Sequence, residues 1–215
     1  MPRRSLPAIA GDGSSPLQPS LRERKHLRAR QTILDEATRL FLAGGYSNTT
    51  LKDIADAAET SIATIVRYFG SKDAILLHRE RAVVSELAER VGSRAHRTLS
   101  DGVRGVTETS FLDLTERSLL FEIMITEPEC VHLLATMRRE WENVVEELFL
   151  QFCPKTRQGR LRAKSLAYML AAIGMANTQF WHENRKRFDL RTSQQGLIDE
   201  FITAFVEPLE KNYDA

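Results

Sequence analysis

The sequence predicts an all-α protein, and three observations support this prediction. Apolar residues recur three and four positions apart over long stretches, which is the spacing of one helix face. No stretch shows the strict alternation of apolar and polar residues that a half-buried strand requires. Glycines and prolines divide the chain into segments of helical length. With 42% apolar residues among 215, the chain can build a small domain beside a larger one.

Residues 1–21 differ in composition from everything that follows them. Residues 1–20 contain four prolines, two glycines and several serines, and they show no helical spacing of apolar residues. Such a composition buries too little apolar surface to offset the entropy lost on ordering. We therefore expect residues 1–21 to form a disordered, basic, proline-rich tail.

The first helix is predicted to run from about Arg22 to the Gly44–Gly45 pair, which would end it. Apolar residues at helical spacing define its buried face: Ile33, Leu34, Ala37, Leu40 and Phe41. Residues 1–30 hold seven basic and two acidic residues, whereas the whole chain has a net charge of +1. This asymmetry indicates an anionic partner at the N-terminal end of the chain.

Residues 49–73 are predicted to form three short helices in close succession. Thr50 can cap the first helix, with Asp53 completing a capping box. After a tight turn at Glu59–Thr60, Ser61 can cap the second helix. Two short helices joined by a tight turn match the helix-turn-helix pattern.

The second of these helices presents Ile62, Ala63, Val66 and Arg67 on the face opposite its buried side. Small residues on this face would let the helix backbone come close to a groove. The sequence therefore predicts that this face is the recognition surface of the helix-turn-helix.

A corner follows this helix, in which Gly70 suits a left-handed C-cap and Ser71 caps the third helix. The backbone N–H groups at the start of that helix favour an anion. Tyr68 and Lys72 flank it, and both can donate a hydrogen bond to a phosphate oxygen. The alternatives are a half-buried tyrosine with a wet hydroxyl and a solvated surface lysine.

The stretch "LFLAGGYSNTTLKDIADAAETSIATIVRYFGSKDAIL" (40–76) resembles the TetR family of bacterial transcriptional regulators. It matches the pattern of that family in Leu-Phe, Gly-Tyr, Thr-Thr, Ile-Ala, Tyr-Phe and Lys at the same spacings. The resemblance implies a set of DNA-binding positions, with the phosphate clamp at Tyr68 and Lys72. These positions are Thr50, Ser61, Ile62, Ala63, Thr64, Val66, Arg67, Tyr68 and Lys72.

Two departures from the family pattern affect this surface. The turn is usually Gly-Val-like, but here it is Glu59–Thr60, which loses a glycine and adds a negative charge near DNA. The family usually has an aromatic residue where this chain has Val66, so one DNA contact is lost or replaced by an apolar contact with a thymine methyl. The basic run 21–30 would add non-specific affinity as an arm in the minor groove, or it is the solvated start of the first helix.

Residues 77–215 carry no phosphate loop, zinc spacing or nucleophile elbow, so we expect no enzyme activity, no metal and no cofactor. An all-α enzyme or scaffold that merely contains a helix-turn-helix remains the remote alternative. Two cysteines fit a reduced, intracellular protein. The longest apolar run, 166–176, is too short to span a membrane, so we expect a cytoplasmic location.

The larger C-terminal part, residues 76–215, is predicted to be helical, with breaks near Gly92, Gly102–Gly105, Pro128, Pro154–Gly159 and Asp189–Ser193. Apolar side chains in such a part belong more often to a core than to a ligand site. The family resemblance nevertheless implies an apolar ligand cavity in this part. The side chains expected to line it are Phe121, Met124, Trp141 and Met169.

The last two long helices are predicted to form a homodimer surface. In 165–181 a stripe of small residues would let a second helix come close, and in 196–209 apolar residues follow one side. The stripe consists of Ala167, Ala171, Gly174 and Thr178, and the apolar side of Leu197, Phe201, Ala204, Phe205 and Leu209. Burial within the monomer is the alternative, and Pro208 is expected to end or kink the last helix.

Together these observations predict a helix-turn-helix domain at 22–75 and a ligand-binding and dimerisation domain at 76–215. The predicted function is that of a homodimeric repressor, which binds a near-palindromic double-stranded operator and is released by a small apolar or amphipathic molecule. A DNA-binding regulator that lacks such an inducer, or that activates, is the main alternative.

Overall fold

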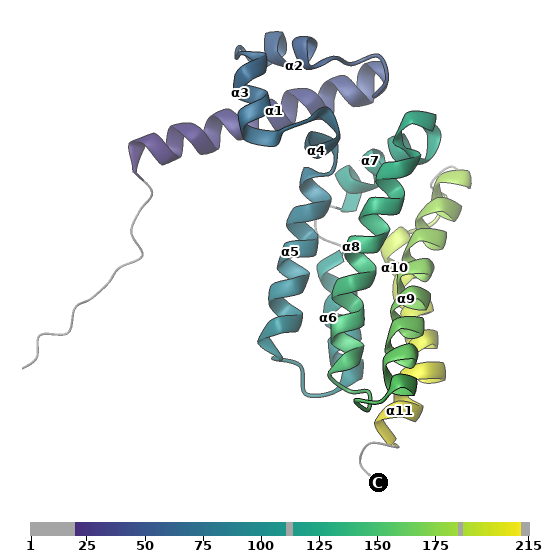
Figure 1. The fold of residues 1–215 in the computed structure, drawn as a ribbon. Helices are drawn as coiled ribbons and strands as arrows, with labels where there is room; N and C mark the ends of the chain where they lie inside the picture. The colour runs from purple at the N-terminus through teal and green to yellow at the C-terminus, as the bar shows by residue number, and fades with distance from the viewer. Residues whose placement is uncertain (1–19, 111–113, 185–186, 212–215) are drawn as a thin grey trace, which may run out of the picture.

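The computed structural model describes residues 20–110, 114–184 and 187–211. Within these ranges all regular structure is helical and no strand occurs, which confirms the all-α prediction. Figure 1 shows a small helical unit at one end of a longer bundle. The fold therefore consists of an N-terminal helix-turn-helix domain and a larger C-terminal helical domain.

Four helices make up the N-terminal domain, and the first of them projects beyond the other three (Figure 1). They are α1 (Leu21–Gly44), α2 (Leu51–Ala57), α3 (Ile62–Phe69) and α4 (Lys72–Leu76). Helix α1 begins with a reciprocal capping box, in which Ser20 Oγ accepts from Glu23 N and Glu23 Oε2 accepts from Ser20 N. Leu21 is thus helical rather than part of the expected tail, while residues 1–19 lie outside the described residues.

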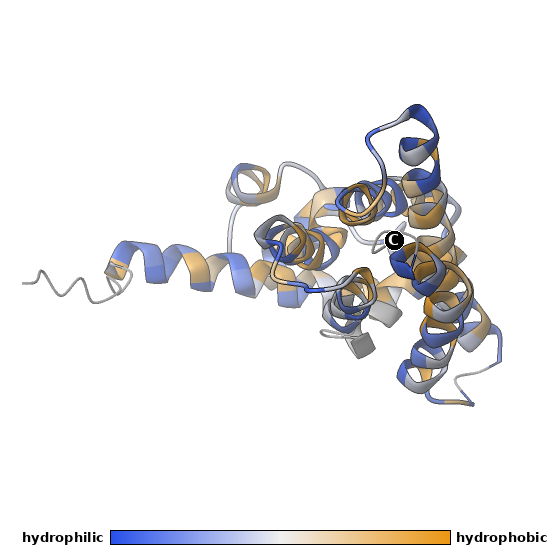
Figure 2. Cartoon of the chain, turned by 90° about the horizontal axis from the view of Figure 1, so that it is seen from below, coloured by the Kyte–Doolittle hydropathy of each residue, from blue (hydrophilic) through white to orange (hydrophobic). Residues whose placement is uncertain are grey.

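The C-terminal domain is built from long helices that run along the bundle axis in Figure 1. They are α5 (His78–Ser93), α6 (Leu99–Ser110), α7 (Leu114–Thr126), α8 (Val131–Leu150), α9 (Arg157–Glu183) and α10 (Leu190–Phe201). A 3₁₀ turn (Pro128–Cys130) connects α7 to α8, and a π-helical segment (Ile202–Val206) leads from α10 into α11 (Glu207–Lys211). Figure 2 views the bundle from below and shows hydrophobic helix faces turned toward one another.

The break expected near Gly92 is present, because α5 ends at Ser93, whereas the break expected near Gly102–Gly105 was wrong, because α6 continues through these glycines. A Cβ atom at Gly102 would lie 2.7 Å from Leu148 Cδ1 on α8. Glycine at this position therefore serves the close packing of α6 on α8. Tertiary contact overrides the low helix propensity of glycine here.

Pro208 does not end the last helix. The chain instead passes through the π-helical turn at Ile202–Val206 and continues as α11 to Lys211. Proline lacks the N–H that would bond to the carbonyl four residues earlier, and a wider turn accommodates this missing donor.

Two apolar clusters form the interior. One lies inside the bundle and includes Leu87, Val103, Leu148 and Phe201. The other starts in the N-terminal domain, with residues such as Phe41, and continues without interruption into α7 and the first half of α8. Trp141 packs against both clusters, so the two domains share one continuous interior.

Glu59 forms the tight turn between α2 and α3 with a backbone φ of +48°, in the left-handed region. A side chain in this region costs about 1–2 kcal/mol, and glycine removes this cost. We expect Glu59→Gly to raise the midpoint of thermal unfolding by about 2–4 °C for each kcal/mol gained, measured by circular dichroism.

Glu59→Ala is the matched control, because it removes the carboxylate but keeps a Cβ atom at the same φ. It should leave the midpoint almost unchanged. An equal rise in both variants would show that charge, rather than backbone strain, limits stability at this turn.

Candidate nucleic-acid interface and interior cavity

Local capping contacts set the first residues of α2 and of α3. Thr50 Oγ1 accepts from Asp53 N at 3.1 Å, while Thr50 N donates to Asp53 Oδ2 at 2.8 Å. Ser61 Oγ accepts from Thr64 N at 3.1 Å and lies 2.9 Å from the Thr64 hydroxyl. The caps predicted at Thr50 and Ser61 are therefore present, and they fix where α2 and α3 begin.

Helix α3 has one buried face and one exposed apolar face. Ile65 is fully buried, whereas Ile62 and Val66 expose 44% and 46% of their surface. Ala63 and Arg67 are exposed beside them. Isolated exposed apolar residues are ordinary, but a contiguous set on one short helix marks an interaction surface.

Lys72 differs from the solvated lysine considered as an alternative for it. Its Nζ donates to the carbonyl oxygens of Tyr46 at 2.9 Å and Thr49 at 3.0 Å, and lies 3.9 Å from the centre of the Tyr46 ring. Lys72 thus holds the loop between α1 and α2 against the start of α4. The resemblance to the family suggested a phosphate contact, but this structural role could not be predicted from spacing.

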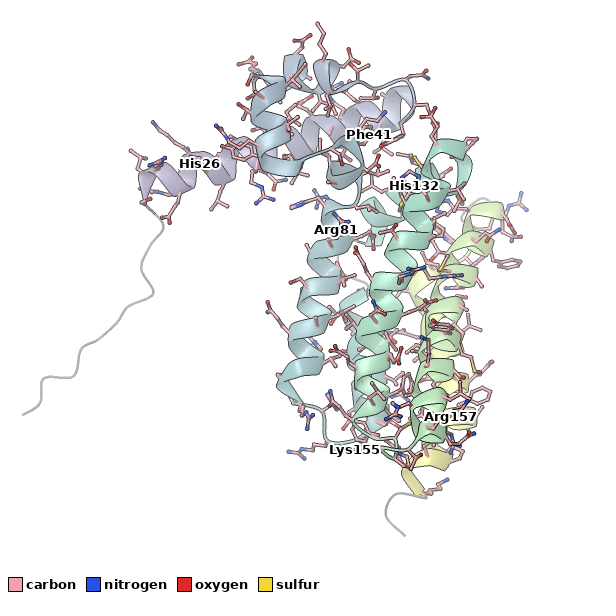
Figure 3. All side chains as sticks on the ribbon, in the orientation of Figure 1. His26, Phe41, Arg81, His132, Lys155 and Arg157 are labelled. Carbon is pink, nitrogen blue, oxygen red and sulfur yellow. The ribbon has the colours of Figure 1, made fainter. Side chains whose placement is uncertain are left out.

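Tyr68 is half-buried at the end of α3, and its hydroxyl lies 3.1 Å from His26 Nδ1 on α1. The guanidinium of Arg67 lies 5.1 Å from the centre of the Tyr68 ring. Figure 3 shows His26 on the projecting part of α1. The basic run 21–30 is therefore a helix beside the end of α3 rather than an extended arm.

A polar cluster at the domain boundary, in which only Tyr46 is buried, joins the N-terminal domain to α8. The Tyr46 hydroxyl donates to Asp73 Oδ1, and His132 Nε2 lies 3.3 Å from Asp73 Oδ2. The hydrogen bond from Tyr46 lowers the pKa of Asp73 below its ordinary value, while burial raises the pKa of Tyr46 well above its own. Both shifts keep a carboxylate opposite a protonated tyrosine, which is the pairing that this hydrogen bond needs.

A second contact between the domains lies at the end of α7. Ser47 Oγ donates to Glu127 Oε2 at 2.6 Å. Gly45, with φ +83°, lets this corner come close, because a Cβ atom there would lie 2.7 Å from Glu127 Oε1. The glycine that ends α1 therefore also positions α1 against the C-terminal domain.

The bundle encloses a cavity of about 130 Å³ where the two apolar clusters meet. Phe121, Met137 and Trp141 line its upper part, and Arg138, which is exposed, marks where it reaches the surface. Further apolar lining comes from Val106, Val145, Leu170, Ala171, Gly174, Met175, Leu190 and Ile198. Polar lining comes from Glu80, Thr107, Thr178 and Gln194.

Of the four ligand residues expected from the sequence, Phe121 and Trp141 line this cavity and Met124 and Met169 do not. Met124 is fully buried beneath the N-terminal domain, and Met169 points outward from α9. Helical spacing gives the inward face of one helix but not the depth at which a side chain meets a cavity.

Sequence reasoning missed the polar lining residues Glu80 and Gln194. Both are in phase with the buried face of their helix, Glu80 with Val83 and Gln194 with Ile198. A polar residue at a core position was the signal that could have found them.

The side chains that α9 and α10 expose are not the ones expected to form the dimer surface. Ala167 is buried, and Ala171, Gly174 and Thr178 line the cavity, so the small-residue stripe faces the interior. Phe201 and Leu209 are also buried. The large apolar side chains that these C-terminal helices expose are Leu161, Tyr168, Met169, Phe180, Leu197 and Phe205.

No helix in the described part of the chain is long and apolar enough to cross a membrane. Among the same residues, His, Cys, Asp and Glu side chains nowhere gather as a set that could hold a metal ion. Burial raises the pKa of Cys130 to about 11, which favours the unreactive thiol.

Comparison with known proteins gives matches to regulators. Residues 33–78 match the family model described as bacterial regulatory proteins, tetR family. The HTH-type transcriptional regulator TcmR of Streptomyces glaucescens is 45% identical over 64 residues, which span 30% of this chain and 28% of TcmR. The HTH-type transcriptional activator FasR of Mycolicibacterium smegmatis is 26% identical over 178 residues, which span 79% of each chain.

A solved structure of Thermus thermophilus FadR, described as a TetR-family transcriptional repressor in complex with lauroyl-CoA, shares the fold. It has a TM-score of 0.57 and 21% identity, and the match covers 80% of this chain and 93% of FadR. The family model covers the helix-turn-helix, and the structural match extends the likeness over the bundle. Residues 33–78 therefore form the helix-turn-helix of the TetR family of bacterial regulatory proteins, and the described chain shares the fold of solved regulators of that family.

Proposed function

We propose that this chain is a homodimeric repressor that binds a near-palindromic DNA operator and leaves it when a small molecule occupies the cavity. The observation that carries the proposal is the exposed face of α3, where Ile62, Val66 and Arg67 stand beside one another above a fully buried Ile65. A helix that presents such a face on a capped helix-turn-helix fits the major groove. A regulator of this kind would work in the cytoplasm, where bacterial DNA lies.

The proposed DNA contacts divide by chemistry. Ile62, Ala63, Val66 and Arg67 would face base edges, with Arg67 able to bind a guanine through two hydrogen bonds. Residues with hydroxyl or amine donors would bind the phosphate backbone, which positions the helix. These are Thr50, Ser61, Thr64, Tyr68 and Lys72, and Lys72 keeps one of its three N–H donors for a phosphate after its two carbonyl contacts.

The position of the cavity supports control by a ligand. Phe121 and Met137 belong both to its lining and to the apolar cluster that continues into the N-terminal domain. A ligand that displaces them would change the packing under α1 and α4. The ligand would shift the equilibrium between the DNA-binding and the released conformation only by the difference in its binding free energy for the two. Such coupling free energies are typically about 1–3 kcal/mol.

Exposed apolar residues on the C-terminal helices support a homodimer. Phe180 and Phe205 expose 57% and 43% of their surface, and Tyr168 on α9 and Leu197 on α10 are exposed as well. We propose that residues 165–181 and 196–209 pair with the same segments of a second copy. One helix-turn-helix per chain would then meet each half of a two-fold operator.

Activation is the second candidate function. FasR, which matches this chain over 79% of both lengths, is described as a transcriptional activator. If the operator lies upstream of a promoter rather than across it, the same DNA-binding surface would activate transcription instead of repressing it.

The proposed function is tested by selecting binding sites from random duplex DNA. We expect two inverted half-sites whose centres lie about 34–36 Å, or a small multiple of this, apart. Gel-shift titration of the selected duplex should show one dimer bound cooperatively. Half-sites bound singly at full affinity would contradict the proposal.

A variant of the dimer surface provides the control for this selection. Phe205→Glu places a charge on the exposed apolar face and should yield monomers by light scattering that bind the selected duplex much more weakly. Glu86→Gln alters an exposed residue of α5, outside both proposed dimer segments, and should leave the dimer intact.

Arg67→Ala should relax the preference for particular base pairs by about 1–3 kcal/mol, because a bidentate contact to one base is lost. Tyr68→Phe should instead weaken binding to all sequences alike, since only a hydroxyl that contacts backbone is removed. Anisotropy titrations against operators mutated at single positions would measure both. A uniform loss in Arg67→Ala would contradict the assignment of this side chain to base readout.

Arg22 lies one helical turn before His26, on the face of α1 that meets Tyr68, whereas Arg24 lies on the opposite face. If the projecting helix binds phosphate, Arg22→Gln should reduce the slope of log affinity against log salt by about one unit. Arg24→Gln is the matched control and should leave the slope nearly unchanged. Equal slopes for both variants and the wild-type chain would remove α1 from the DNA interface.

A further inference from the structure

The end of α3 presents two aromatic side chains, and α1 contacts both of them. The His26 ring meets the Tyr68 ring edge-on, with ring centres 5.8 Å apart, and its Nδ1 atom lies 3.1 Å from the Tyr68 hydroxyl. One helical turn later, the guanidinium of Arg30 lies 5.2 Å from the centre of the Phe69 ring. His26 and Arg30 both precede residues 33–78, the segment that the family model matches, so the family pattern does not account for these contacts.

The hydrogen bond between His26 and Tyr68 can run in either direction. The Tyr68 hydroxyl has one proton, which it can donate to one acceptor, and it can also accept a hydrogen bond. If the hydroxyl donates to His26 Nδ1, its proton is not available for a phosphate. If Nδ1–H donates to the hydroxyl, the tyrosine proton is directed away from α1. The direction of this one hydrogen bond therefore decides whether Tyr68 can bind DNA as a donor.

The contacts around the Tyr68 ring keep its hydroxyl next to α1. The guanidinium of Arg67 lies 5.1 Å from the ring centre, and the Phe69 ring meets it edge-on with centres 6.5 Å apart. Tyr68 also packs against the apolar cluster of the N-terminal domain. A phosphate must therefore meet the hydroxyl where it lies, with His26 still beside it.

We propose that His26 is a positioning residue for the contact between Tyr68 and the DNA backbone, an inference that rests on the proposed function. In the DNA-bound state, His26 Nδ1–H donates to the Tyr68 oxygen, and the Tyr68 hydroxyl donates to a phosphate oxygen. The accepted hydrogen bond turns the hydroxyl proton toward the DNA and strengthens its bond to phosphate, because consecutive hydrogen bonds polarise one another. His26 thus acts on the DNA through Tyr68.

This arrangement makes DNA binding depend on protons. A charged histidine carries a proton on both ring nitrogens, whereas a neutral one carries a proton on only one of them. Bound DNA should therefore favour the charged ring of His26, and affinity should rise as pH falls. The charged groups around this ring are Arg22 and Arg30 on α1, Arg67 on α3, and Glu23, whose carboxylate caps the start of α1. A phosphate is attracted by the charged ring and by the three arginines alike.

Two substitutions separate the hydrogen bond from the ring contact. His26→Asn places an amide N–H near the position of Nδ1 but removes the ring, whereas His26→Phe keeps a ring but has no donor. In anisotropy titrations of the selected operator at about pH 7.5, His26→Asn should bind nearly as the wild-type chain does, and His26→Phe about three- to tenfold more weakly. In a Tyr68→Phe background, His26→Phe should cause no further loss, because the hydroxyl that it positions is absent. Circular dichroism checks that each variant folds.

The pH profile is a readout that a purely structural role would not change. Between about pH 8 and pH 5.5, where histidine side chains gain their charge, the operator affinity of the wild-type chain should rise more than that of His26→Asn. His96→Asn is the matched control, because His96 lies between α5 and α6, at the end of the bundle away from the N-terminal domain (Figure 1). It should keep the wild-type profile.

The outcomes separate this inference from the proposed function. Equal operator affinities for the wild-type chain and His26→Phe, or a loss in His26→Asn as large as in His26→Phe, would overturn the positioning role and leave the DNA-binding regulator standing. Phosphate contacts do not depend on sequence, so the same titrations are run on a random duplex at low salt. A loss in His26→Phe that His26→Asn restores, in a chain that selects no DNA sequence, would support the positioning role and overturn the proposed function.

Discussion

The shared apolar interior beneath the N-terminal domain is the feature on which the rest of the structure depends. Helices α2 and α3 have seven and eight residues, and α4 has five. Helices this short are not stable alone in water, because the free-energy cost of nucleation exceeds the stabilisation from so few hydrogen bonds. They persist because Ile54, Ile65 and Ile75 pack into a cluster that α7 and α8 complete. The proposed DNA-binding surface is therefore held in place by the domain that contains the cavity.

This arrangement makes the two domains depend on each other's packing. Phe121, Met137 and Trp141 are at once cavity wall and part of the interior beneath the helix-turn-helix. Close-packed interiors transmit a displacement rather than absorb it. A displacement of side chains at the cavity can therefore reach α4 through direct packing contacts.

Polar contacts at the same boundary fix how the domains are oriented. The Tyr46–Asp73–His132 cluster and the Ser47–Glu127 hydrogen bond tie the α1–α2 loop to the end of α7 and the start of α8. The lowered pKa of Asp73 means that this carboxylate stabilises the fold above its ordinary pKa and that the contribution is lost as pH falls through the lowered value. Apolar contact brings the domains together, and these directional bonds select one orientation.

The sequence by itself determined what depends on neighbours along the chain. The caps at Thr50, Ser61 and Ser71, the positive φ at Gly70 and the exposed face of α3 all follow from contacts within four residues, and all were predicted. Tertiary structure decided what depends on distant segments. Lys72 donates to carbonyl oxygens of residues more than twenty positions earlier in the chain. Gly102 lies within a helix because Leu148 packs closely against it. The small-residue stripe of α9 faces a cavity. Periodicity identifies the buried face of a helix, but only the packed fold decides whether that face meets a side chain, a cavity or a second copy.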